Sequence, residues 1–216
     1  MPVNQELFYP ILERRDDYKR TKRGEYYSDY REYYDEIETD CQKCCVYCDV
    51  SLDEIGGEGM QLDHFRPKAI PEFESLSNDP NNLVLSCPKC NRLKSNHWPA
   101  DVSSDKTCDG DCGFIDPFKE NRKDYFEIEN TGEIQGRKSP SDYMIRLLKL
   151  DRMARKQMRR KRLLREEINR ITIKVSAKIY EINNMVNAGN PRSDVSRQLT
   201  GLGDLHSMEK QLLETL

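Results

Sequence analysis

The chain has 216 residues, of which 36% are hydrophobic and 34% are charged. Average domains carry roughly 25% charged residues, so we expect one small core with extensive solvated or partner-facing surface. The net charge of −3 argues against a uniformly basic nucleic-acid-binding protein. No run approaches the roughly 18 apolar residues of a membrane span, and the start lacks a basic segment followed by an apolar one. We therefore expect a cytoplasmic protein with no membrane segment.

The N-terminal region, residues 1–40, is predicted to be helical. Between residues 6 and 38, Tyr, Glu, Asp and Arg are abundant, and apolar residues such as Leu7, Ile11 and Ile37 recur at roughly helical spacing. Gly24 interrupts the pattern. The sequence therefore predicts two helices with a break near this glycine.

Residues 41–116 contain the eight cysteines and many Gly, Pro, Asn and Asp residues. This composition favours short strands and loops, which we expect to bury little apolar surface. In a reducing compartment, cysteines at such spacings indicate metal thiolates in preference to disulfides. We expect a metal ion, with zinc as the first hypothesis, to hold this region in place of a core.

Two Cys-x-x-Cys pairs form the predicted zinc site, because each pair can direct two thiolates at one tetrahedral ion. The pairs are Cys45/Cys48 and Cys87/Cys90. The alternative is four buried free thiols. The remaining cysteines are Cys41, Cys44, Cys108 and Cys112. They could bind a second zinc, be spare thiols, or compete with Cys45 and Cys48 for the register of the zinc site.

Between the two pairs, the sequence predicts a strand at residues 61–65 and a second strand at 83–86, followed by a short helix beginning at Asn91. A histidine with a pKa near neutrality can accept a proton from water, and carboxylate or carbonyl oxygens can hold a hard cation. Asp63, His64 and Asn91 offer these groups. Neighbouring residues on a strand point to opposite faces, so Asp63 and His64 share a site only if the strand ends or twists there. The alternative for this dipeptide is a hydrogen-bonded turn.

Four basic residues flank the proposed site and are predicted either to contact phosphates or to be solvated charges. They are Arg66, Lys68, Arg92 and Lys94.

Further along the chain, residues 125–134 are predicted to form a hairpin, and a long helical pattern begins after Pro140. Its apolar stripe is ended by Gly189 and Pro191, with a shorter helix expected from Asp204. The stripe comprises Leu164, Ile168, Ile171, Val175, Ile179, Ile182 and Val186.

The segment 152–165 contains eight cations and no acid. It is interpreted as a nucleic-acid contact, a contact with an acidic face of a partner, or a solvated helix face, with nucleic acid slightly favoured.

The order D-H-x-x-P, then N-L-V-L-S-C-x-x-C-N-x-x-K-S, resembles the HNH, or ββα-metal, nuclease motif in the variant whose final His is Asn. The spacing from Asn82 to Asn91 is also similar to that of the HNH domain in RNA-guided CRISPR nucleases, which lacks the zinc cysteines. The resemblance implies His64 as general base and Asp63 and Asn91 as ligands of a catalytic Mg²⁺ or Mn²⁺. It also implies that Asn82 orients His64 or its loop.

Over about residues 45–136, the segments CVYC, LDHFRPK, NLVLSCPKCNRLKS and FIDPFKENRKDYFEIENTGEI resemble the PtuB family of HNH nucleases. This family belongs to Septu-type and retron-linked anti-phage systems. The resemblance implies an ATPase partner of the PtuA type and a hetero-oligomeric complex. Cys41, Cys44, Cys108 and Cys112 lie outside the HNH motif.

The expected fold is therefore α+β, with a small zinc-clamped ββα-metal core flanked by N-terminal helices and a long C-terminal helical region. The expected regions are 1–40, 41–138 and 139–216. The predicted function is metal-dependent hydrolysis of nucleic-acid phosphodiester bonds, in DNA more than RNA. One alternative is a non-catalytic zinc ribbon that binds nucleic acid or bridges an ATPase to its target, and another is an interaction protein built on the long helix.

Overall fold

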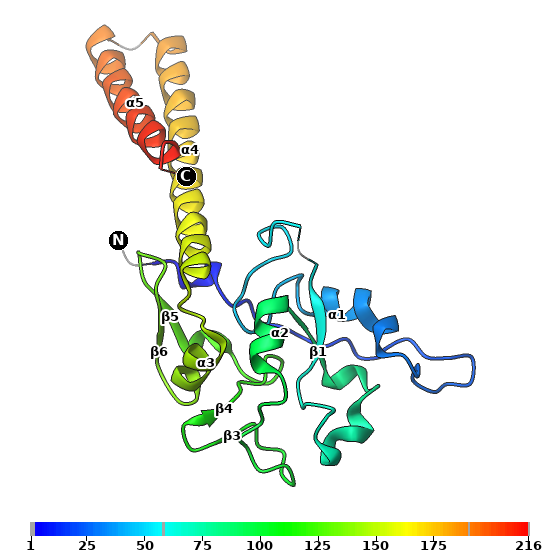
Figure 1. The fold of residues 1–216 in the computed structure, drawn as a ribbon. Coiled ribbons are helices and arrows are strands. Elements are labelled where there is room, and N and C mark those ends of the chain that lie inside the picture. Colours follow the sequence, from blue (N-terminus) through cyan, green and yellow to red (C-terminus); the bar gives the residue numbers. More distant parts are fainter. Residues whose placement is uncertain (1–2, 58, 190, 216) are drawn as a thin grey trace. The chain divides into compact units, whose positions relative to one another are not determined.

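A computed structural model describes residues 3–57, 59–189 and 191–215 (Figure 1). The chain divides into two compact units, residues 1–158 and 159–216. The helices are α1 (Tyr34–Asp40), α2 (Pro88–Lys94), α3 (Ser141–Leu148), α4 (Met153–Asn187) and α5 (Arg192–Leu213). The strands are β1 (Gln61–His64), β2 (Leu83–Ser86), β3 (Cys108–Asp109), β4 (Cys112–Gly113), β5 (Phe126–Ile128) and β6 (Ile134–Gly136). The mixture of helices and small sheets confirms the α+β prediction.

Within the described residues, the strands pair into three two-stranded antiparallel sheets, β1–β2, β3–β4 and β5–β6. In the first sheet, Gln61 pairs with Ser86 and His64 pairs with Leu83. Helix α2 follows β2 directly and packs against β1. These three elements form the predicted strand–strand–helix unit.

Helix α2 begins at Pro88, three residues before the predicted start at Asn91. Proline is favoured in the first turn of a helix, where its missing N–H costs no intrahelical hydrogen bond. The predicted strand at 83–86 is confirmed, and the predicted strand at 61–65 ends one residue earlier, at His64.

The N-terminal segment differs from the prediction of two helices. Residues 8–29, all of which the structure describes, contain no helix, and the second predicted helix is confined to the short 3₁₀ turn Tyr30–Tyr33 and α1. Arg14 donates hydrogen bonds to the carbonyls of Pro80 and Leu83, and Arg15 pairs with Asp40 at 2.9 Å. These tertiary contacts stabilise an extended chain, which local helical spacing cannot reveal.

The expectation that the cysteine region buries little apolar surface is wrong. All four residues of β2 are buried, because α1 covers the strand in addition to its partner β1. Aromatic residues extend this core, with Trp98 stacked on Phe114 and in edge contact with Phe65 and Phe73. The region therefore has a hydrophobic core in addition to its cysteines.

The predicted hairpin is confirmed as β5–β6, in which Ile128 pairs with Ile134. The helical pattern after Pro140 is divided between α3 and α4. Lys149 follows α3 in the left-handed conformation, with a φ of 49°, and this residue ends the helix.

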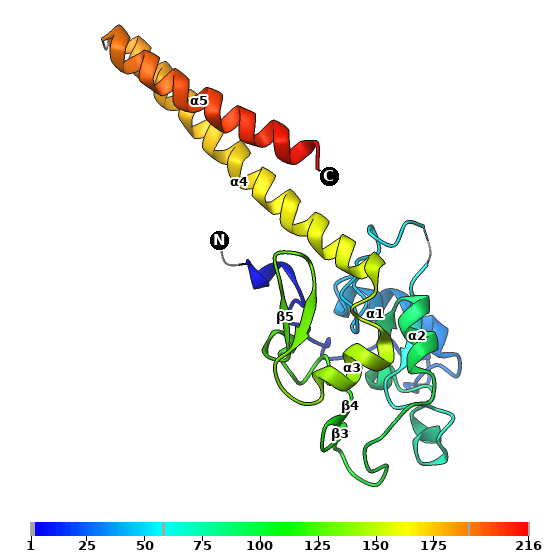
Figure 2. The same cartoon turned by 60° about the vertical axis from the view of Figure 1, so that its left-hand side comes forward.

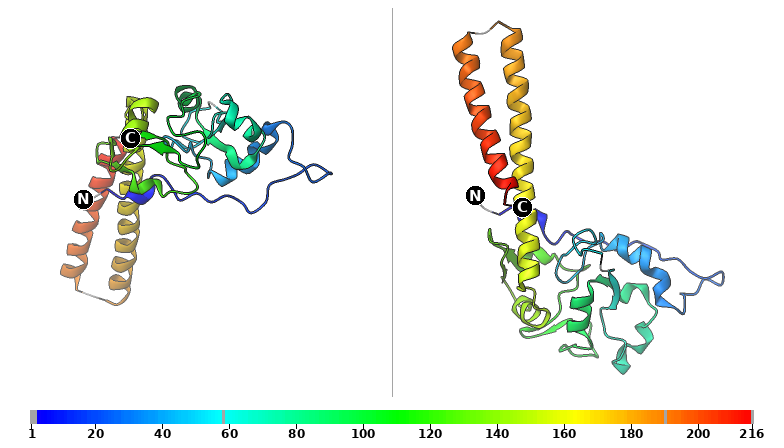
Figure 3. Two further views of the ribbon diagram at one scale, coloured as in Figure 1. Left: turned by 90° about the horizontal axis from the view of Figure 1, so that it is seen from below. Right: turned by 45° about the horizontal axis from the view of Figure 1, so that its top comes forward.

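The second unit, residues 159–216, is an antiparallel pair formed by the remainder of α4 and by α5 (Figures 2 and 3). Thr172 Oγ1 hydrogen-bonds Glu209 across the pair at 2.6 Å, and Ile171 and Ile182 are buried. The predicted stripe is therefore partly correct, because Ile179 and Val186 are exposed.

Helix α4 ends before Gly189 as predicted, whereas α5 begins at Arg192 and not at Asp204. Among the helices that the structure describes, none combines the length and apolar character needed to cross a membrane.

Candidate active site

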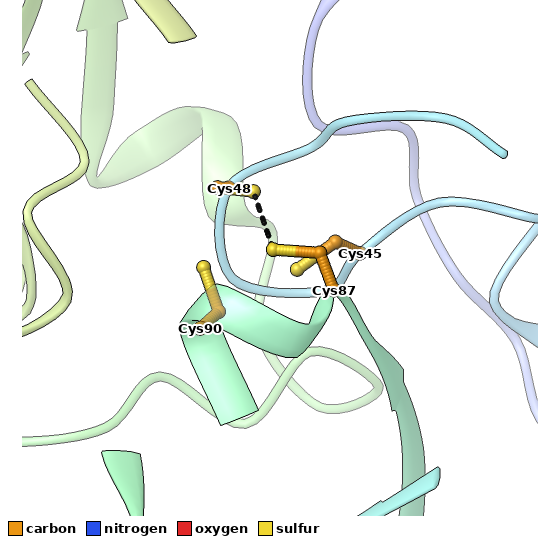
Figure 4. A group of neighbouring side chains, drawn as sticks. All are labelled: Cys45, Cys48, Cys87 and Cys90. Carbon is orange, nitrogen blue, oxygen red and sulfur yellow. Dashed lines mark hydrogen bonds between the residues drawn. The ribbon is translucent and has the colours of Figure 1, made fainter. Parts of the chain in front are cut away.

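Four cysteine side chains converge at one end of the ββα unit (Figure 4). Cys45 and Cys48 lie on the loop before β1, and Cys87 and Cys90 lie at the start of α2. Their Sγ atoms all lie within 4.8 Å of one another, and all four residues are buried. The prediction that these cysteines form one cluster is confirmed.

The backbone around each pair holds the thiols in place. The carbonyl of Val50 accepts a hydrogen bond from the Cys45 amide, and the Asp49 amide donates to the Cys45 carbonyl, which closes a tight turn. Cys87 is the N-cap of α2, and its carbonyl accepts from the Asn91 amide. Both pairs are thus fixed by local turns.

The cluster fits a zinc ion. Zinc–sulfur bonds of about 2.3 Å in a tetrahedron place neighbouring sulfurs about 3.8 Å apart, and the Sγ atoms of Cys48 and Cys87 are 3.7 Å apart. Contacts with the other thiols, Cys45 first, lower the pKa of Cys87. Four buried sulfur donors at this spacing match a tetrahedral zinc site, so the donor set fits a structural metal.

Two arginines at the start of α4, Arg152 directly before the helix and Arg155 in its first turn, contact the same thiols. Arg155 Nε lies 3.2 Å from Cys48 Sγ. Arg152 Nη2 lies 3.6 to 3.8 Å from the sulfurs of Cys48, Cys87 and Cys90. The sequence showed these arginines only as members of a basic run.

The structure does not bring the other four cysteines into a second site. Among the described residues, the four cysteines above form the only group of three or more His, Cys, Asp or Glu side chains close enough to share an ion. Cys41 is buried, and its Sγ accepts a hydrogen bond from the Leu85 amide at 3.3 Å, whereas Cys112 is exposed on β4. Cys41, Cys44, Cys108 and Cys112, the ligands of the possible second zinc, are therefore not grouped in this arrangement.

His64 is the last residue of β1 and is 7% exposed. Its Nε2 lies 2.8 Å from the carbonyl oxygen of Ser77, and the ring of Tyr30 meets its edge with centroids 4.7 Å apart. Burial lowers the pKa of His64, and the contact with Ser77 acts against this shift. The imidazole is consequently fixed in orientation and favoured in its neutral form.

Asn82 holds the turn that follows His64. Its Oδ1 accepts a hydrogen bond from the Arg66 amide at 2.9 Å, and its Nδ2 donates to the Arg66 carbonyl at 3.0 Å. The Asn82 carbonyl also accepts from the Phe65 amide. One buried amide side chain therefore fixes the backbone directly after the histidine.

Asp63 faces the other side of β1, toward α2. Its carboxylate accepts a hydrogen bond of 2.6 Å from Tyr47 Oη and lies 3.1 Å from Lys94 Nζ. Lys94 is fully buried and also donates to the carbonyl of His64 at 2.8 Å. Burial raises the pKa of Asp63 and lowers that of Lys94, while their mutual attraction opposes both shifts.

Asn91 lies on α2 at the edge of an open hollow of about 710 Å³. Its Nδ2 donates to Gln61 Oε1 at 2.9 Å. The hollow is lined by Gln61, Pro88, Lys89, Asn91, Arg92 and Ser95. It contains basic and amide groups but neither Asp63 nor His64.

The expected convergence of Asp63, His64 and Asn91 is not found. β1 remains a paired strand through His64, so the two neighbouring side chains lie on opposite faces. The Asp63 carboxylate is neutralised by the Lys94 ammonium, and Asn91 is bonded to Gln61. As arranged, these residues do not fit a resident Mg²⁺ or Mn²⁺, because the only carboxylate among them already has a cation.

The four basic residues that were predicted to contact phosphates differ in how exposed they are. The prediction for Lys94 is wrong, because this side chain is fully buried. Arg66 lies over the rings of Phe73 and Trp98, with its guanidinium carbon 5.2 Å and 5.0 Å from their centroids. Lys68 and Arg92 are exposed, so these two remain available to a phosphate backbone.

Part of the chain is similar to known proteins. Residues 45–97 match the HNH endonuclease family. The chain is 28% identical over 109 residues to the Septu protein PtuB of Bacillus mycoides (strain KBAB4). This match covers 42% of the chain and 36% of that protein, so it spans just over a third of the relative's length. No solved structure matches the chain. Residues 45–97 therefore resemble an HNH endonuclease domain, and part of the chain is similar to PtuB.

Proposed function

We propose that the chain is an endonuclease that hydrolyses nucleic-acid phosphodiester bonds, in DNA more than RNA. It would act as the nuclease of a Septu-type anti-phage complex with an ATPase of the PtuA type. The observation that carries the proposal is the buried His64, held by the Ser77 carbonyl at the end of β1 within an HNH domain. The Septu context rests on the partial similarity to PtuB.

The contact with Ser77 assigns a role to each nitrogen of His64. A carbonyl oxygen only accepts hydrogen bonds, so Nε2 carries the hydrogen and donates it to Ser77. Nδ1 then keeps its lone pair and can accept a proton from an attacking water. The lowered pKa of His64, which results chiefly from burial, keeps this nitrogen unprotonated near neutral pH.

Asn82 and Tyr30 would position the base. Asn82 fixes the turn after His64 through the backbone of Arg66, and Tyr30 packs against the edge of the imidazole. A base held within a fraction of an ångström of its working geometry loses little freedom on reaction. In this proposal Asn82 acts on the loop and makes no contact with the substrate.

A divalent cation is a separate part of the proposal. HNH nucleases use such an ion, which supplies charge stabilisation at the phosphate. Because the Asp63 carboxylate is paired with Lys94 and Asn91 is bonded to Gln61, we assign no ligands to this ion. We expect EDTA to abolish cleavage and Mg²⁺ or Mn²⁺ to restore it, and we assign no step to the ion.

The proposal is tested by measuring cleavage of duplex DNA, single-stranded DNA and RNA with Mg²⁺ or Mn²⁺, each with and without the ATPase. His64→Ala should lower the cleavage rate by about 10²- to 10⁴-fold, which is the contribution of a general base. His97→Ala is the matched control, because His97 is exposed on the segment after α2. Its rate should equal that of the wild type.

Zinc content and the circular dichroism spectrum should be the same in both histidine variants, because neither side chain belongs to the cysteine cluster. Cleavage by His64→Ala at the wild-type rate would remove His64 from the role of base.

A non-catalytic zinc ribbon is the second candidate. The observation that favours it is the buried Asp63–Lys94 pair, because a purely structural hairpin has no need of an available carboxylate. Such a module would bind nucleic acid or the ATPase without cutting. Divalent-dependent cleavage that is lost in His64→Ala would exclude this candidate, whereas binding without cleavage in every arm of the panel would support it.

A further inference from the structure

The basic segment 152–165 begins with two arginines that turn toward the cysteine cluster. We propose that Arg152 and Arg155 form a cationic cap on a zinc–thiolate cluster, so that metal retention and docking of the first turns of α4 depend on each other. The inference rests on a metal in the cluster and not on nuclease activity. It assigns a role to part of the segment that the proposed function leaves unexplained.

The contacts of the cap are directional. Arg155 Nε points at Cys48 Sγ at 3.2 Å, and its Nη2 lies 3.5 Å from Cys87 Sγ. Arg152 Nη2 contacts the sulfurs of Cys48, Cys87 and Cys90. Two guanidinium groups, one from the residue before α4 and one from its first turn, therefore donate to three of the four thiols.

Charge balance explains why arginines are placed here. Four thiolates around one Zn²⁺ carry a net charge of −2, and all four cysteines are buried. A buried negative charge is unfavourable unless it is paired and hydrogen-bonded. Two guanidinium groups supply +2, so the capped cluster is neutral, and each planar group can donate several hydrogen bonds at once.

Arg152 also joins the cluster to α3. Its Nη1 donates to the carbonyls of Leu148 and Lys149 at 3.1 Å and 2.9 Å. These carbonyls belong to the end of α3 and to the left-handed residue that follows it. One side chain therefore holds the end of α3, the turn before α4 and the thiols together.

The segment 152–165 thus has more than one role. Arg152 and Arg155 are half-buried and directed at sulfur, which prevents them from following a nucleic-acid backbone. Exposed members such as Arg160 have no such contact with the cluster. Any nucleic-acid or partner contact would therefore begin after the first turns of α4.

The proposal is tested with the full chain by first measuring zinc per protein and then following zinc transfer to a chromogenic chelator. The double variant Arg152→Met/Arg155→Met should lose zinc roughly tenfold to a hundredfold more readily than the wild type, as loss of second-sphere partners does in other sites. Arg160→Met removes an exposed charge from the same helix and should transfer zinc at the wild-type rate. Arg155→Lys, which keeps the charge, should be less affected than Arg155→Met.

Hydrogen exchange of the zinc-loaded double variant gives the second readout. Amides of residues 153–158 should exchange roughly tenfold faster than in the wild type, whereas those of β5–β6 should be unchanged. If the double variant fails to fold, the same two measurements are made on Arg155→Met alone.

Unchanged zinc transfer and unchanged exchange in the arginine variants would overturn the proposal. Absence of bound zinc in the folded wild type would also overturn it. In either case the nuclease proposal still stands or falls on His64→Ala, because the cap makes no contact with His64.

Discussion

Lys94 touches both residues of the Asp-His dipeptide through a single buried ammonium group. It pairs with the Asp63 carboxylate and donates to the His64 carbonyl, so it ties β1 to α2 from within the unit. Buried ion pairs add little net stability relative to apolar replacements, but removal of one partner leaves an uncompensated charge. The buried, charged carboxylate of Asp63 is therefore stable only while Lys94 is present as its counterion.

Lys94→Met should lower the free energy of unfolding by about 3–5 kcal/mol, because Asp63 would lose its counterion in a buried position. Urea denaturation monitored by Trp98 fluorescence measures this change. Arg92→Met is the control on the same helix, because Arg92 is exposed, and its effect should stay within about 0.5 kcal/mol.

The double variant Asp63→Asn/Lys94→Met should be more stable than Lys94→Met alone, since the charge that needed compensation is gone. Equal unfolding midpoints for Lys94→Met and the wild type would show that the pair contributes nothing to the fold.

At the scale of single elements, local signals were sufficient for the cysteine cluster and the short strands. The Cys-x-x-Cys pairs form tight turns determined by a few adjacent residues, and the four-residue β2 has a continuous apolar pattern. Gly189 and Pro191 likewise mark the end of α4. Within each Cys-x-x-Cys pair, strand and helix end, the determining residues are neighbours in sequence, whereas the meeting of the two pairs was expected only from the four ligands that zinc requires.

The features that the sequence did not reveal depend on distant partners. Arg14 stabilises an extended N-terminal segment through carbonyls of Pro80 and Leu83, which lie more than sixty positions away. The separation of Asp63 from His64 depends on β1 staying paired with β2 through His64, whose partner is Leu83. The spacing of residues along the sequence does not indicate such contacts.

Cys87→Ser should remove zinc and destabilise the β1–β2–α2 unit, because a structural metal contributes its binding free energy to folding. The buried core around β2 should nevertheless keep the chain partly folded. Zinc analysis and thermal unfolding by circular dichroism measure both effects. Cys112→Ser, which alters an exposed cysteine outside the cluster, should change neither.

Full zinc occupancy in Cys87→Ser would contradict the assignment of the ligands. Complete unfolding would instead show that the apolar core cannot hold this region without the ion.

At the scale of the whole chain, the residues of the proposed active site and metal cluster belong to one of the two units. All four cluster cysteines, His64 and both capping arginines belong to residues 1–158. The second unit is a helical pair with one buried seam and exposed apolar side chains such as Ile173, Tyr180 and Met208.

A chain ended after residue 158 should fold and bind one zinc ion, because the four cluster cysteines and the two arginines that contact them all lie within it. Size-exclusion chromatography and zinc analysis check this expectation against the full chain. A truncated chain that aggregates or lacks zinc would show that the second unit is required for the first to fold.

The side-chain amide of Asn82 both accepts and donates hydrogen bonds, and this position requires both. It accepts from one backbone group and donates to two others, the carbonyls of Arg66 and Leu76. An aspartate has the same shape, but its ionised carboxylate has no hydrogen to give. Deamidation at this position would therefore turn two attractive contacts into repulsion between oxygens, directly beside the histidine. The loss of one nitrogen would be enough to loosen the turn.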